Sequence, residues 1–241
     1  MSPRQHQGSP LNASRYYLVV TGLFVMALVV SNIVAVKIVG VWDRVFDAGT
    51  LLFPLTYLIG DVLTEVYGYR RARTVIWIGF LANLVAVGSI QIAIHLPVAD
   101  FWAENEAAYE TVLGTTWRIF LGSLAAYLVG EFTNSFILAK LKIATRGRWL
   151  WTRTISSTIA GEGLDSVIFS SIAFAGTGID LTNQIVTIWV IKVAWEVAAT
   201  PLTYAVVNFL KREEGVDVYD LETDFNPLAV GRQPRRRRTG G

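Results

Sequence analysis

Apolar segments of membrane-spanning length follow one another along most of this chain. Six are apparent, at residues 17–36, 50–67, 75–95, 116–138, 154–175 and 184–209. A helix of about 20 apolar residues crosses the hydrocarbon core of a bilayer and satisfies its own backbone hydrogen bonds there. The sequence therefore predicts an all-α integral membrane protein with six transmembrane helices. The second segment is the weakest, because its apolar core covers only residues 51–59, and a re-entrant element is an alternative there.

The composition leaves little room for anything besides this membrane domain. Hydrophobic residues make up 53% of the 241 residues, and charged residues make up 17%. We expect a membrane domain at residues 16–212, an N-terminal tail at 1–15 and a C-terminal tail at 213–241. The basic end of the C-terminal tail, residues 231–241, is expected to be disordered and to act as a topogenic signal rather than as a nucleic-acid site.

Basic residues predict the orientation. If both tails are cytoplasmic, 17 of the 21 lysines and arginines lie on the inner side of the membrane. The outer loop between the third and fourth segments is instead acidic, with Asp100, Glu104, Glu106 and Glu110. Since positively charged loops stay in the cytoplasm, both termini are predicted to be cytoplasmic.

Enzymatic alternatives lack the residues that they need. The chain has no cysteine and only two histidines, His6 in the tail and His95 at an outer helix end, so thiolate metal sites and metal hydrolases are excluded. An intramembrane aspartyl protease using Asp61 and Asp165 is a distant alternative, but GEGLD at residues 161–165 is not the Gly-x-Gly-Asp sequence of such enzymes. We expect no catalytic residues, no cofactor and no metal.

Five carboxylates interrupt the apolar segments where a lipid-facing helix would not keep them. A charge at the bilayer centre costs at least ~2.5 kcal/mol, so such side chains face a protein interior and usually mark a substrate or ion path. Asp61, Glu131 and Glu162 each lie nine residues from a basic residue at the inner end of their segment. That separation is ~13.5 Å along a helix, near the bilayer midplane, whereas Asp165 and Glu196 lie at ~18 Å and ~22 Å. A site assembled from several helices near the midplane is typical of a transporter.

Polar side chains accompany these acids three or four residues away and so share their helix faces. The companions are Thr64 and Glu65 in the second segment, Asn134 and Ser135 in the fourth, Ser166 in the fifth and Lys192 in the sixth, where Trp195 lies three residues after Lys192. Any one such stripe could serve only for hydrogen bonding between helices. Four stripes at similar depth favour a shared polar interior. Lys192 could neutralise Glu196 on its own helix, or it could compensate a different acid.

Together these groups suit a small, flat molecule that is rich in hydrogen-bond donors. Carboxylates accept paired N–H donors, the amides of Asn134 and Asn32 both donate and accept, and Trp195 offers a ring for stacking. An inorganic cation would also bind carboxylates, but it needs no aromatic or amide partner. The residues therefore favour a planar organic solute over a cation.

Four runs of the sequence resemble a known family. They are DAGTLLFPLTY at residues 47–57, GDVLTEVYGY at 60–69, GEGLDS at 161–166 and ATPLTY at 199–204. In this order and at these separations they are similar to the queuosine precursor transporter family, over about residues 31–227. The resemblance implies a bacterial inner-membrane protein that takes up a 7-deazaguanine for making queuosine in tRNA. The implied substrate is chiefly 7-cyano-7-deazaguanine, with 7-aminomethyl-7-deazaguanine as an alternative. It also implies six helices related in fold to the substrate-binding components of energy-coupling-factor transporters.

The residues and the resemblance meet in one hypothesis for the site. A deazaguanine carries an N–H beside an NH2 group, and we expect Glu131 or Glu162 to accept both hydrogen bonds. An amide of Asn134 or Asn32 would address the substrate carbonyl group, and Trp195 would stack on the ring. The other charged residues are expected to orient the substrate, gate the path or relay protons. These are Asp165 and Glu196, as further residues of the site, and Asp61, Glu65 and Lys192, as gating or proton-relay residues.

The transport machinery is open to two interpretations. The chain has no Gly-rich phosphate loop and could not hydrolyse ATP unaided. We expect a solitary carrier in the lipid bilayer, driven by the solute gradient or by protons, with the binding subunit of an ATPase-driven complex as the alternative. Small residues of the third segment, Gly79, Ala82 and Ala86, could serve a homo-oligomer or packing within one chain equally well.

Overall fold

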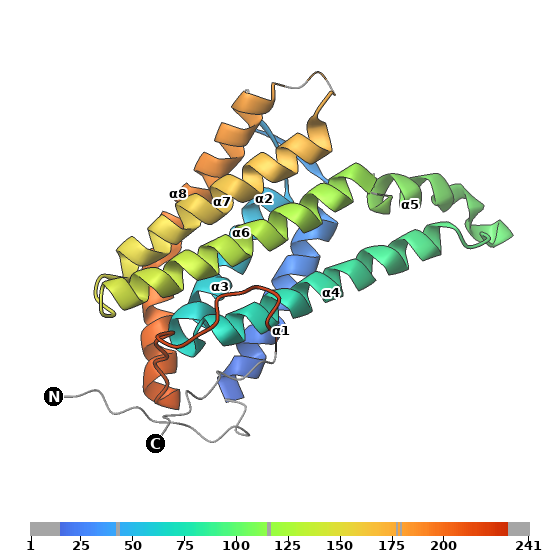
Figure 1. The fold of residues 1–241 in the computed structure, drawn as a ribbon. Coiled ribbons are helices and arrows are strands. Elements are labelled where there is room, and N and C mark those ends of the chain that lie inside the picture. Colours follow the sequence, from blue (N-terminus) through green and yellow to red (C-terminus); the bar gives the residue numbers. More distant parts are fainter. Residues whose placement is uncertain (1–14, 42–43, 115–116, 177, 179, 231–241) are drawn as a thin grey trace.

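A computed structural model describes residues 15–41, 44–114, 117–176, 178 and 180–230 (Figure 1). The predictions made for residues 1–14 and 231–241 lie outside this range. The long helices are α1 (Arg15–Val34), α3 (Pro54–Tyr67), α4 (Tyr69–Ile94), α6 (Trp117–Ala144), α7 (Leu150–Phe174) and α8 (Leu181–Glu214). The short elements are strands β1 (Ile38–Val41) and β2 (Arg44–Asp47), helix α2 (Gly49–Leu52), the 3-10 helix η1 (Asp100–Asn105) and helix α5 (Glu106–Leu113).

The chain is a multi-pass membrane protein. In the described part of the chain, five helical stretches are long and apolar enough to cross a membrane, namely residues 15–34, 49–67, 69–94, 119–144 and 181–214. Helix α7 is 25 residues long but more polar, since it carries Arg153, Glu162 and Asp165. Because α7 is not among the five, the sixth span stays a prediction.

Helix α3 forms the centre of the bundle. It packs against α1, α4, α6 and α8, and 13 of its 14 residues are buried. Pro54 begins the helix, which needs no N–H at that position, and the preceding helix α2 is nearly continuous with it through Phe53. The apolar core of this segment is short because the helix faces protein on almost every side rather than lipid.

Helices α6 and α7 make the most extensive contact of any two helices described, and two glycines allow their close approach. A Cβ atom at Gly161 would lie 2.9 Å from the backbone oxygen of Gly130 and 2.9 Å from Cβ of Asn134. A Cβ atom at Gly130 would lie 3.0 Å from Cβ of Asp165. Carbon atoms in ordinary contact are about 3.5–4.0 Å apart, so these positions require glycine if the polar faces of the two helices are to meet.

A short β-hairpin supplements the predicted all-α fold. Strands β1 and β2 form an antiparallel hairpin, with Ile38 paired to Asp47 and Val39 to Phe46. The Asp47 carboxylate then accepts hydrogen bonds from the backbone N–H and the hydroxyl of Thr50, at 2.9 Å and 2.8 Å, and so leads the chain into α2. The hairpin joins α1 to α2 and lies between the first and second apolar segments of the sequence.

The start of α1 and the end of α8 lie at one end of the bundle. The backbone N–H of Tyr16 donates to Glu214 at 2.9 Å, and the ring of Tyr16 contacts that of Phe209. The turns between α3 and α4 and between α6 and α7 lie at this same end, which we call the turn end. After Gly215 (φ 63°) the chain runs back across the ends of α3 and α4, as the red trace in Figure 1 shows.

Candidate functional site

Polar faces of α3, α6, α7 and α8 meet inside the bundle. Asp61, Glu131 and Glu162 are fully buried, Glu196 is 1% exposed and Asp165 is 4% exposed. Each acid that was predicted to avoid lipid therefore lies within protein. The cost of a charge in lipid had predicted inward faces for these five carboxylates, and in the structure they lie in the polar interior of these four helices.

Lys192 of α8 reaches across to α7. Its ammonium group lies 2.8 Å from Oε2 of Glu162 and 2.5 Å from Oδ2 of Asp165, and 4.6 Å from the ring centroid of Phe53. Lys192 therefore does not neutralise Glu196 of its own helix, and the alternative holds, in which it compensates other acids. One ammonium group is thus shared by two carboxylates that lie one helical turn apart on α7.

Glu131 of α6 has a different environment. Neither of its carboxylate oxygens has a hydrogen-bond partner among the described residues. Helix α3 passes close by at Gly60, where a Cβ atom would lie 2.9 Å from Oε2 of Glu131. Glu131 interacts electrostatically with Glu162 and Asp165. It is a buried acceptor beside an ion pair, and the hydroxyl of Thr56, which donates to the backbone oxygen of Phe53, is a neighbouring donor.

Asp61 and Asn134 join α3 to α6. The amide of Asn134 donates to Oδ1 of Asp61 at 2.7 Å, and one turn further on the hydroxyl of Thr64 donates to Ser135 at 3.1 Å. The second oxygen of Asp61 and the amide oxygen of Asn134 have no partner in the region that the structure describes. The Thr64–Ser135 bond acts as helix-to-helix hydrogen bonding, whereas Asp61 and Asn134 keep acceptor capacity.

Glu196 lies on α8, one turn closer to the turn end than Lys192. Both of its carboxylate oxygens lack a partner within the described ranges, and it interacts electrostatically with Asp61. Pro201 lies inside α8 one turn later, where proline removes a backbone hydrogen bond. Trp195, by contrast, is half-buried against the apolar cluster of the bundle, so the structure places this ring with the core rather than against an acid.

Asn32 lies in a separate polar group. Its amide donates to Oδ1 of Asn83 at 3.4 Å and accepts from the hydroxyl of Ser123 at 2.9 Å. These three residues tie α1 to α4 and α6. The structure therefore brings Asn134, but not Asn32, into hydrogen bonding with the acids.

Two aromatic residues of the region escaped the sequence analysis. Tyr57 is fully buried, its hydroxyl has no partner among the described residues, and it interacts electrostatically with Glu131, Glu162 and Asp165. Phe53 lies one turn earlier, with its ring centroid 6.1 Å from that of Tyr57. Both lie in the run at residues 47–57, four residues apart, and this helical spacing could have indicated a shared face.

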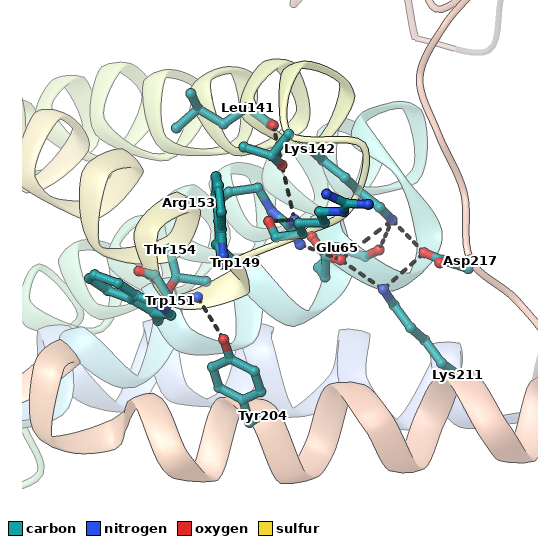
Figure 2. A network of polar contacts seen from close by, with 12 residues as sticks. Glu65, Leu141, Lys142, Trp149, Trp151, Arg153, Thr154, Tyr204, Lys211 and Asp217 are labelled. Atoms are coloured by element: carbon teal, nitrogen blue, oxygen red, sulfur yellow. Dashed lines mark hydrogen bonds and ion pairs between the residues drawn. The ribbon is translucent and has the colours of Figure 1, made fainter.

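Glu65 lies away from the other acids, in a cluster of ion pairs near the turn end (Figure 2). Its Oε1 atom is 2.7 Å from Lys211 and 2.8 Å from Arg153, and Lys142 lies at 3.6 Å. The sequence analysis counted all three cations on the inner side of the membrane without predicting their burial. In the structure Lys142 and Arg153 are buried. The signal that could have indicated a buried ion pair is Glu65 itself, an acid four residues after Asp61 in an apolar segment.

The charge balance limits what the site can do. With both carboxylates ionised, Glu162, Asp165 and Lys192 together carry one net negative charge. No lysine or arginine of the described residues forms an ion pair with Asp61, Glu131 or Glu196. Buried carboxylates need donors, cations or protons to be stable. The arrangement is therefore suited to bind a group with several N–H donors, or to exchange protons.

Comparison with known proteins agrees with this description. Residues 47–206 match the family described as "Putative vitamin uptake transporter". A "Probable queuosine precursor transporter" of Bacillus subtilis (strain 168) is 28% identical over 200 residues, which cover 80% of this chain and 86% of the relative. A protein of the same description from Haemophilus influenzae (strain ATCC 51907 / DSM 11121 / KW20 / Rd) is 27% identical over 126 residues, or 52% of this chain and 51% of that protein.

No solved structure matches the chain. The family match covers all five buried acids and two thirds of the sequence, and it confirms the resemblance read from the four motifs. It also excludes the protease alternative, because the family is one of transporters and not of enzymes. The chain belongs to the vitamin uptake transporter family, among whose members are relatives described as queuosine precursor transporters.

Proposed function

We propose that this protein takes up a queuosine precursor, 7-cyano-7-deazaguanine or its aminomethyl relative, through the buried acid site. The relatives described as probable queuosine precursor transporters indicate the substrate class. The observation that carries the proposal is a group of buried acceptor atoms that lack a hydrogen-bond partner by geometry in the described part of the chain, among them both oxygens of Glu131, one of Asp61 and the amide oxygen of Asn134. Such atoms are costly unless a donor meets them.

Glu131 is the best candidate for the donor edge of the substrate. Glu162 was an equal candidate from the sequence, but the ammonium group of Lys192 lies 2.8 Å from it. Glu131 can accept two parallel hydrogen bonds from an N–H and an NH2 group without displacing a bound cation. Asn134 and Asp61 lie on the adjoining faces of α6 and α3, where they can address other polar atoms of a flat ligand.

Aromatic residues complete the proposed site. Phe53 and Tyr57 flank the Lys192 ion pair, and the free hydroxyl of Tyr57 can donate to a substrate acceptor such as a carbonyl group. We assign the stacking role to Phe53 rather than to Trp195, which packs against the apolar core. Lys192, Asp165 and Glu196 orient the substrate or exchange protons, and Asn32 belongs to a support between helices.

The proposed topology has six spans with both termini in the cytoplasm of a bacterial inner membrane. Helix α7 serves as the sixth span, because its polar residues Glu162 and Asp165 are buried among other helices and do not meet lipid. The turn end carries Arg70, Lys140 and Arg148, as expected for the cytoplasmic side. The substrate would thus enter from the side of the β-hairpin and leave past the turn end.

The test is uptake of radiolabelled 7-cyano-7-deazaguanine into proteoliposomes that hold this protein alone, with and without a pH gradient. Uptake without an added ATPase supports a solitary carrier, and stimulation by an inward proton gradient supports proton coupling through the acids. If uptake requires an added ATPase, the protein is instead the binding subunit of a larger complex. If labelled precursor is neither bound nor transported under any of these conditions, the substrate assignment is wrong.

A further inference from the structure

A single buried carboxylate gathers cations from three helices at the turn end. Lys211 of α8 and Arg153 of α7 lie within 2.8 Å of Oε1 of Glu65, and Lys142 of α6 lies at 3.6 Å (Figure 2). Glu65 stands on α3 one turn beyond Asp61 of the substrate site. The cluster therefore holds the ends of four helices together between that site and the turn end.

The segment after α8 adds the second anion. Asp217 accepts from Lys142 at 2.6 Å and lies 2.9 Å from Lys211, and the backbone oxygen of Val218 accepts from Lys142 at 2.8 Å. Burial raises the pKa of Asp217, but hydrogen bonds with Lys142 and Lys211 and their charges outweigh it, so its pKa lies below 3.8. Its side chain is 42% exposed, which makes it the most accessible member of the cluster.

Residues 216–230, which we call the C-terminal strap, are held along their whole length. The N–H of Val218 donates to Val66 at 3.2 Å, and Asp220 accepts from the N–H of Tyr69 at 2.9 Å. Arg73, which is 1% exposed, donates to three strap carbonyl oxygens at 2.6–2.8 Å. Trp77 donates to the carbonyl oxygen of Pro227 at 2.9 Å.

The strap packs against Gly68, a position that requires glycine. Gly68, between α3 and α4, has φ 82°, and a Cβ atom there would lie 2.6 Å from a methyl group of Val218. The strap therefore lies directly on the α3–α4 turn. Any movement that separates α3 from α6 and α7 at this end must also move or detach the strap.

We propose that the C-terminal strap is the latch of the turn-end gate, and that Asp217 fastens it to the cations that close the ends of α3, α6, α7 and α8. A substrate can leave past the turn end only when these helix ends separate. Separation exposes Lys142 and Arg153 to water, which can then solvate them in place of their carboxylate partners. The same movement releases the strap. The inference rests on the proposed transport function, but its test does not depend on the identity of the substrate.

Cysteine accessibility measures the gate directly, because the natural chain has no cysteine. Ser135→Cys places one thiol on α6, fully buried, and seven residues, or ~10.5 Å, from Lys142 toward the substrate site. The purified protein in proteoliposomes is treated with a membrane-impermeant maleimide added to the turn-end side or to the opposite side. The comparison is made in four backgrounds: the unchanged strap, Asp217→Asn, Asp217→Glu and Glu222→Gln.

We expect Asp217→Asn to speed labelling from the turn-end side roughly five- to tenfold, because it removes charge-assisted bonds of a half-exposed group. Asp217→Glu keeps the charge, and Glu222→Gln changes an exposed carboxylate of the same strap, so both should label within about twofold of the unchanged strap. Trp77→Phe, which removes one strap bond without touching the ion pairs, should also speed labelling from this side only.

Two results would overturn the latch. One is equal labelling rates for Asp217→Asn and Glu222→Gln. The other is faster labelling of Asp217→Asn from both sides of the membrane, which indicates general loosening of the helices rather than opening of a gate. A failure of precursor uptake with the expected labelling pattern would refute the substrate assignment while leaving the latch supported.

Discussion

The contact between α6 and α7 leads to a sharp prediction about Gly161. A Cβ atom at this position would lie 2.9 Å from Cβ of Asn134 and 2.9 Å from the backbone oxygen of Gly130. Neither atom is at the end of a flexible side chain, so the helices must separate by roughly 0.6 Å to restore ordinary contact. Overpacking of this kind typically costs about 1–3 kcal/mol.

The matched control is Gly163, on the same helix. There the nearest atom to an added Cβ is Nε1 of Trp189 at 3.5 Å, which is ordinary contact. Both glycine-to-alanine changes gain about 1 kcal/mol of helix propensity, so this gain cancels in the comparison. Gly161→Ala should therefore be about 1–3 kcal/mol less stable than Gly163→Ala.

The same displacement should weaken the site. The hydrogen bond between Asn134 and Asp61 is 2.7 Å long, and a shift of ~0.6 Å would stretch it beyond the usual range. Thermal unfolding in detergent and precursor uptake in proteoliposomes are the two assays. We expect a lower unfolding temperature and reduced uptake for Gly161→Ala only. Equal unfolding temperatures and equal uptake for the two variants would refute the argument that this close approach builds the site.

Three further predictions concern the charged groups. Lys192→Met leaves two buried carboxylates without their cation, so we expect about 3–5 kcal/mol lower stability in thermal unfolding, and an unchanged unfolding temperature would contradict the ion-pair assignment. Arg73→Gln removes three bonds to the C-terminal strap and should make it cleavable by chymotrypsin, whereas Arg70→Gln, an exposed residue of the same helix, should not. Because the pKa of Asp217 in the folded protein lies below 3.8, its contacts stabilise the strap above that pH and are lost as the pH falls through the lowered value. The protection of the Val218 N–H against hydrogen exchange, corrected for the intrinsic pH dependence of exchange, should therefore change little from pH 7 to 5 and fall under strong acid, and this loss should disappear in Asp217→Asn.

Much of the site followed from the sequence because two simple quantities sufficed. Residue counts along a helix gave the depth of Asp61, Glu131 and Glu162, and the energy of charges in lipid required inward faces. The same reasoning predicted that polar neighbours such as Asn134 share those faces, and this residue does bond to Asp61. Depth and face are properties of single helices, so they could be read without knowing how the helices pack.

What could not be predicted depends on rotation and contact between helices. The partners of Lys192 lie on a neighbouring helix, and only the close approach of α6, α7 and α8 selects them over Glu196. The separation of Asn32 from the acids has the same origin, since depth says nothing about which side of the bundle a residue occupies. The burial of the cations around Glu65 was not predicted, because a charge count cannot distinguish a buried arginine from an exposed one. The β-hairpin and the C-terminal strap follow from contacts between distant segments, which local patterns do not contain.

Direct binding of 7-cyano-7-deazaguanine to purified protein tests the central assignment of Glu131 most directly. Glu131→Gln replaces one acceptor oxygen of a buried group by a donor, and Glu104→Gln makes the same change at an exposed position of η1. A lost hydrogen bond to a charged group is worth about 1.5–3 kcal/mol, or a roughly 10- to 150-fold weaker Kd. We expect that loss for Glu131→Gln, with an unchanged Kd for Glu104→Gln. Equal affinity of both variants and the natural protein, with Glu131→Gln folded, would contradict the proposal that this carboxylate binds the substrate.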